Sequence, residues 1–93
     1  MKIINLKEYG RSLSTRKFGK RLSNKINFSE SENIILNFED VYFVDSSFSD
    51  ELIGKNVKKI GFKNFKKKVK IENATDNIKI IIKKSIMDRL LEN

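Results

Sequence analysis

Residues 44–54 read VDSSFSDELIG, and the chain changes from a predicted strand to a predicted helix across them. Upstream, residues 33–38 read NIILNF, a short apolar run that is typical of a strand buried on both faces of a parallel sheet. Downstream, apolar residues recur three to five positions apart over residues 48–60, which predicts a helix with one apolar face. Ser47 and Asp50 have the spacing of a capping box, so we expect this helix to begin at about Ser47.

The rest of the chain predicts further strands and helices in alternation. We expect a first strand over residues 1–6, and then a helix whose apolar residues recur at every fourth position from Phe18 to Ile26. Lysines alternate with apolar residues over 66–73, which is typical of an edge strand. A last helix is expected over 76–91, so the predicted order is βαβαβα.

Several residues are expected to cap these helices or to lie where elements pack closely. Ser14 or Thr15 is expected to cap the first helix, and Thr75 the last. Gly61 is well placed as a left-handed C-cap of the middle helix. Gly19 lies inside the first helix, where glycine costs about 1 kcal/mol relative to alanine, so we expect another segment to pass close to its backbone.

The predicted order of elements indicates a small α/β domain. Strands that alternate with helices imply a mainly parallel sheet, here of three to four strands, with right-handed crossovers. A length of 93 residues is that of one domain, so we expect a single domain over 1–93. A sheet of this size has open edges, which leaves room for pairing with a second copy of the chain.

The composition excludes several kinds of functional site. The chain has no cysteine and no histidine, which removes thiolate chemistry and every nucleophile activated by histidine. The longest apolar run is too short to span a membrane, and the first residues lack the pattern of a signal peptide. We therefore expect a cytoplasmic protein that is not an enzyme, does not enter a membrane, and holds neither a metal nor another cofactor.

The charge changes sign along the chain. The net charge is +7 over residues 1–29, −7 over residues 30–54 and +8 over residues 55–93. The acidic middle could form one face of the domain opposite a basic face, or it could neutralise the basic flanks where the segments meet.

The segment Lys55–Lys70 contains many lysines, two phenylalanines and no acid. Lysines neutralise nucleic-acid phosphates and exposed aromatic rings stack on bases, so nucleic-acid binding is the alternative function. The plainer interpretation is a solvated basic face with Phe62 and Phe65 in the core. The candidate nucleic-acid contacts are Lys58, Lys59, Lys63, Lys66, Lys67 and Lys68.

The residues from 33 to 54 resemble the central strand, turn and helix of STAS domains, the anti-anti-sigma factors of bacterial partner-switching systems. The turn in those proteins reads DSSG, whereas this chain has Phe48 in place of the glycine. A shorter STAS-like family of unknown function is more similar, with the signature SSFADE followed by an apolar residue and glycine, and with an LSTR segment before its first helix. Here residues 46–51 read SSFSDE and residues 13–16 read LSTR.

The resemblance implies a non-catalytic module that binds other proteins. In anti-anti-sigma factors a kinase phosphorylates the serine directly after the aspartate, and by position that serine is Ser46, with Ser47 as a second candidate. The implied partner is a histidine-kinase-like ATPase or serine kinase. The residues alone allow a simpler interpretation, in which Ser46 only caps the helix. The expected partner surface consists of Asp45, Ser46, Ser47, Ser49, Asp50 and Lys55.

Overall fold

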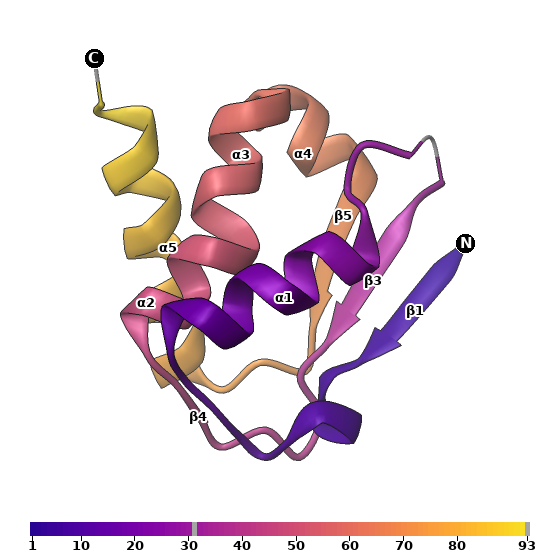
Figure 1. The fold of residues 1–93 in the computed structure, drawn as a ribbon, viewed down its shortest axis with the longest axis vertical. Coiled ribbons are helices and arrows are strands. Elements are labelled where there is room, and N and C mark those ends of the chain that lie inside the picture. Colours follow the sequence, from indigo (N-terminus) through magenta and orange to yellow (C-terminus); the bar gives the residue numbers. More distant parts are fainter. Residues whose placement is uncertain (31, 93) are drawn as a thin grey trace.

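The computed structural model describes residues 1–30 and 32–92, which form an α/β fold around a small parallel sheet (Figure 1). Strand β3 (Ile34–Asn37) lies at the centre of this sheet, and β1 (Lys2–Asn5) and β5 (Val69–Glu72) are its edges. Both edge strands run parallel to β3. A second, two-stranded sheet pairs β2 (Ser12–Leu13) with β4 (Phe43–Val44). The predicted class and the mainly parallel sheet of three strands are confirmed.

One long helix with an irregular middle follows β4. It begins as α2 (Ser46–Ser49), continues through the π-helical turn η2 (Asp50–Gly54), and ends as α3 (Lys55–Ile60). A π-helical turn is widened by one residue relative to an α-helix and is frequent at functional sites. The predicted helix over 48–60 is therefore confirmed, whereas its π-helical turn was not predicted.

Three further helices complete the fold, together with the short 3-10 helix η1 (Leu6–Tyr9). Helix α1 (Arg16–Ile26) connects β1 to β3 and begins at Thr15, whose Oγ1 accepts a hydrogen bond from the N–H of Phe18 at 3.2 Å. Helix α4 (Phe62–Lys68) precedes β5, and α5 (Asp76–Leu90) follows it with Thr75 as its cap. Of the two caps considered for α1, the structure has Thr15.

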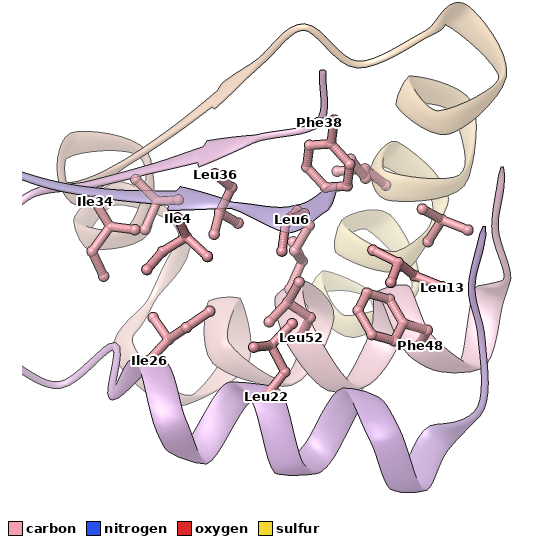
Figure 2. Packing of buried hydrophobic residues seen from close by; sticks show 14 of the residues in the cluster. Ile4, Leu6, Leu13, Leu22, Ile26, Ile34, Leu36, Phe38, Phe48 and Leu52 are labelled. Atoms are coloured by element: carbon pink, nitrogen blue, oxygen red, sulfur yellow. The ribbon is translucent and has the colours of Figure 1, made fainter. Parts of the chain in front are cut away.

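The core lies on one face of the sheet, between the strands and the helices (Figure 2). Ile4, Ile34 and Leu36 point from β1 and β3 into this core. On the opposite face, Ile35 of β3 is only half-buried, and its neighbours Ile3, which is 58% exposed, and Lys70 are exposed. The expectation that the NIILNF strand is buried on both faces is therefore wrong. Right-handed crossovers that progress in one direction across a sheet place their helices on the same side.

Two predictions about the segment after Ile60 are wrong. Lys66–Lys68 belong to α4 and not to the following strand, because Phe65 on the same helix turn enters the core. Gly61 has a φ of 89° but a ψ of 144°, which is not the left-handed helical conformation. The chain extends at this residue so that α4 can begin in a new direction. The open edges at β1 and β5 leave pairing with a second copy as a prediction.

Candidate functional site

The N-terminus of α2 is capped by Asp45. Its Oδ1 accepts a hydrogen bond from the N–H of Phe48 at 2.7 Å, and its Oδ2 accepts one from the N–H of Thr15 at 3.2 Å. The helix begins at Ser46, within one residue of the expected start at about Ser47, but the capping box of Ser47 with Asp50 is wrong, and so is the simple interpretation of Ser46 as the cap. The two oxygens of the Asp45 carboxylate each accept from a different N–H group, one on α2 and one at Thr15. Ser46 is instead an exposed residue of the first turn.

The same contact holds a strained residue. Thr15 has a φ of 80°, which is rare for a β-branched side chain. Its N–H donates a hydrogen bond to Asp45 in the hinge, the strand-to-helix segment of residues 44–54, and its own side chain caps α1. Asp45 therefore fixes the starts of two helices that meet at this point, and the backbone around Ser46 is held in place.

Asp50 lies between two arginines from opposite ends of the chain. Arg89 binds both carboxylate oxygens, with Nε to Oδ1 at 2.7 Å and Nη2 to Oδ2 at 2.6 Å. Arg16 Nη1 lies 2.8 Å from Oδ2. The hydrogen bonds from Arg89, assisted by Arg16, lower the pKa of Asp50 to about 2. Asp50 therefore joins α1 and α5 to the long helix.

Glu51 forms a second, deeper set of ion pairs. Its buried carboxylate accepts a hydrogen bond from Arg16 at 2.9 Å and lies 2.7 Å from Lys55 Nζ. Burial alone would raise the pKa of Glu51, but the contacts with Lys55 and Arg16 outweigh it and hold this pKa below its ordinary value. Gly19 packs here as expected, because a Cβ on it would lie 2.8 Å from Glu51 Cβ and 2.9 Å from Phe48 O.

The acidic middle of the sequence thus neutralises the basic flanks where they meet. Asp50 and Glu51 pair with Arg16, Lys55 and Arg89, and farther away Asp40 pairs with Lys7. The charge pattern allowed either an acidic face or neutralisation between segments, and neutralisation is what the structure shows for Asp50 and Glu51.

The expected partner residues do not all lie on the surface. Ser46 is exposed, Ser47 and Asp45 are half-buried, and Lys55 is exposed beside Glu51. Ser49 is buried, with its Oγ 2.8 Å from Ser85 Oγ on α5, so its side chain lies in the interior. Asp50 is also largely covered, and its side chain is 15% exposed.

Ser46 and Ser47 open onto a pocket of about 330 Å³ between α2 and α5. Three of its six charged lining residues, Lys84, Asp88 and Arg89, come from α5. The sequence analysis did not predict that they lie at this site. The i, i+4 spacing of Lys84 and Asp88 is the one local signal, and this pair is closed at 2.9 Å. The pocket has three cations, Arg16, Lys84 and Arg89, and three carboxylates, Asp50, Asp88 and Glu92.

The lysine segment has one of its two aromatic rings in the core. Phe65 is buried and stacks on Phe28 with ring centroids 6.1 Å apart. Phe62 is exposed, so the expectation that it lies in the core is wrong. Lys58 pairs with Glu92, and Lys68 is half-buried. Nucleic-acid binding stays a prediction, with these exposed candidates: Lys59, Lys63, Lys66 and Lys67.

The stability of the domain is expected to fall as the pH drops below about 4. Asp50 has a folded pKa of about 2 against an ordinary value of 3.8, so its contribution is complete above 3.8 and is lost as the pH falls through 2. The shift corresponds to about 2 kcal/mol at neutral pH. Urea unfolding followed by circular dichroism at several pH values between 2 and 7 measures this loss. Asp50→Asn should flatten the curve, and equal pH dependence in both proteins would contradict the assignment.

Two wider observations concern the residues that the structure describes. No helix over 1–30 and 32–92 is long and apolar enough to cross a membrane. Nor does any group of three or more Asp, Glu, His or Cys side chains in those ranges form a possible metal site.

Comparison with known proteins gives one match. A family model described as a STAS-like domain of unknown function matches residues 18–79, which include the hinge with Asp45 and Ser46 but neither Arg16 nor Arg89. No curated protein and no solved structure matches the chain.

Proposed function

The chain belongs to the STAS-like domains of unknown function, and from this membership we propose that it is a non-catalytic protein-interaction module whose partner surface centres on Ser46. STAS-like domains are generally non-catalytic. The observation that carries the proposal is the exposure of Ser46 on a backbone that Asp45 holds in place, beside a polar pocket. A rigid, exposed turn can bind a partner without the entropy cost of ordering a loop.

Phosphorylation of Ser46 is the regulatory step that we propose at this surface. A phosphate adds about −1.5 to −2 charges at neutral pH, and it would sit at a helix N-terminus, where the backbone dipole favours an anion. Three cations and three carboxylates balance in the pocket, so the phosphate would make it negative. An acidic partner surface would then be repelled without any refolding of the domain. The expected enzyme is a serine kinase or a histidine-kinase-like ATPase, which would also be a binding partner.

Ser46→Glu is expected to release the protein partner of the domain, and Ser46→Ala to retain it. A glutamate in the first helical turn is favoured by the helix dipole, so the variant should fold normally. The measurement is quantitative mass spectrometry of proteins that co-purify with each tagged variant from its native cells. Intact-mass analysis of the wild-type protein from the same cells tests for the phosphate itself.

Ser29→Glu is the matched control, because Ser29 is exposed in a turn outside the pocket. This control should retain the partner. If a partner is found and Ser46→Glu retains it as well as Ser29→Glu does, the partner surface lies elsewhere. If the wild-type protein never carries phosphate on Ser46 or Ser47, the regulatory step is wrong although the interaction can stand.

A further inference from the structure

Helix α5 has a second apolar side, away from the pocket at Ser46. There it forms a groove of about 390 Å³ together with α4 and β5. Three of the apolar side chains are well exposed: Phe62 by 41%, and Met87 and Leu90 by 47% each. The apolar lining consists of Phe62, Ile71, Ile82, Ile86, Met87 and Leu90.

The groove follows the helix for three turns. The residues that α5 contributes, from Lys79 to Leu90, recur three and four positions apart, which is one stripe along a helix about 16 Å long. The adjacent side of α5 buries Ile78, Ile82 and Ser85, and Ile82 also lines the groove. A helix that is apolar on two sides is normally covered on both. The length of the groove is that of about three turns of an amphipathic helix, the kind of segment that docks in apolar grooves.

The charge at the groove has one sign. Lys79 and Lys83 are its charged lining residues, and both are exposed. Within residues 1–30 and 32–92, neither lysine forms an ion pair. A second copy docked groove to groove would bring the same lysines together, and like charges in an interface cost affinity. The complementary partner is therefore acidic.

We propose that this groove binds an amphipathic helix of another protein, apolar on one face and acidic along its flanks. Apolar side chains spaced i, i+3 or i+4 and i+7 would enter the groove, and flanking carboxylates would reach Lys79 and Lys83. This interaction goes beyond the proposed function at Ser46, because it uses a different side of α5 and does not need Ser46.

Three fluorescently labelled peptide helices of about four turns test the proposal. The first peptide has leucines at positions i, i+4 and i+7 with glutamates along both flanks. The second has the same leucines with lysines along both flanks. The third has the composition of the first in scrambled order. By fluorescence anisotropy, the glutamate peptide should bind at least about tenfold more tightly than the other two. Lys79→Glu with Lys83→Glu should reverse the preference in favour of the lysine peptide.

Lys17→Glu with Lys20→Glu on α1 is the matched control, since it changes the net charge equally on exposed residues outside the groove. This variant should still prefer the glutamate peptide. Leu90→Asp should weaken binding of that peptide at least about tenfold with an unchanged circular dichroism spectrum. Lys17, Lys20 and Leu90 are all exposed, so the fold should be retained.

Three outcomes would overturn the proposal. The first is equal binding, or no binding, of the three peptides. The second is self-association by sedimentation equilibrium that Leu90→Asp abolishes, which would assign the groove to a second copy. The third is cosedimentation with phosphatidylserine vesicles without peptide binding, which would assign it to a membrane surface. None of them would affect the proposal for Ser46.

Discussion

Replacing Gly54 with alanine is expected to lower the free energy of unfolding by about 3 kcal/mol, although alanine is the better helix former by about 1 kcal/mol. A Cβ on Gly54 would lie 2.6 Å from Asp50 Oδ1, 3.0 Å from Ser85 O and 3.1 Å from Arg89 Cγ. The first atom is held by Arg89 and the second belongs to the backbone of α5. The methyl group must therefore push α5 away from the long helix.

Urea unfolding at neutral pH, followed by far-ultraviolet circular dichroism, measures the effect of Gly54→Ala. Lys59→Ala is the control on the same long helix, because Lys59 is exposed and a surface substitution should change the stability by less than about 0.5 kcal/mol. An alanine variant as stable as the wild-type protein would contradict the close approach of α5 to η2.

Asp50→Asn is expected to have the second largest effect, a loss of about 2 to 3 kcal/mol. The amide keeps the shape of the side chain but cannot balance Arg89, whose side chain is only 19% exposed, nor Arg16. A covered cation that loses its carboxylate keeps its cost of desolvation. The same urea titration at neutral pH measures the loss.

A double-mutant cycle isolates the interaction between Asp50 and Arg89. Asp50→Asn and Arg89→Gln should each destabilise the domain, and the double variant should lose less than the sum of the two. Asp88→Asn is the control, because it removes an exposed ion pair with Lys84 that should contribute less than about 0.5 kcal/mol. Equal losses in Asp50→Asn and Asp88→Asn would mean that the Asp50 contacts are no stronger than surface pairs.

Local periodicity in the sequence predicted most of the elements, but it failed where two patterns competed. Lys66–Lys68 fit the alternation of the following strand, although lysine is a good helix former and is depleted in strands. The i, i+3 spacing of Phe62 and Phe65 fits a helix, and α4 buries Phe65 in the core. The sequence alone did not show that Phe65 would be buried. The spacing of apolar residues over 48–60 did not indicate the π-helical turn at Asp50–Gly54, because it also fits a regular α-helix.

The sequence predicted a strand-to-helix turn at residues 44–54, and the structure has this turn between β4 and α2, but the ion pairs around it depend on distant residues. Arg16 and Arg89 lie 34 and 39 positions from Asp50 in the sequence. Local spacing cannot indicate such pairs, because they form only when α1 and α5 pack against the long helix. The SSFSDE and LSTR segments lie about 30 positions apart in the sequence. In the structure, hydrogen bonds from Arg16 to Asp50 and Glu51 join them.

The π-helical turn sets the rotational phase of everything that follows it. One extra residue in a turn of helix displaces later side chains by about 100° around the axis relative to a regular α-helix. Val57 is fully buried in this phase, and Lys58 faces solvent. If this turn closed into a regular α-helix without losing a residue, Val57 would rotate toward the direction that Lys58 now takes, so the burial of Val57 depends on the π-helical turn.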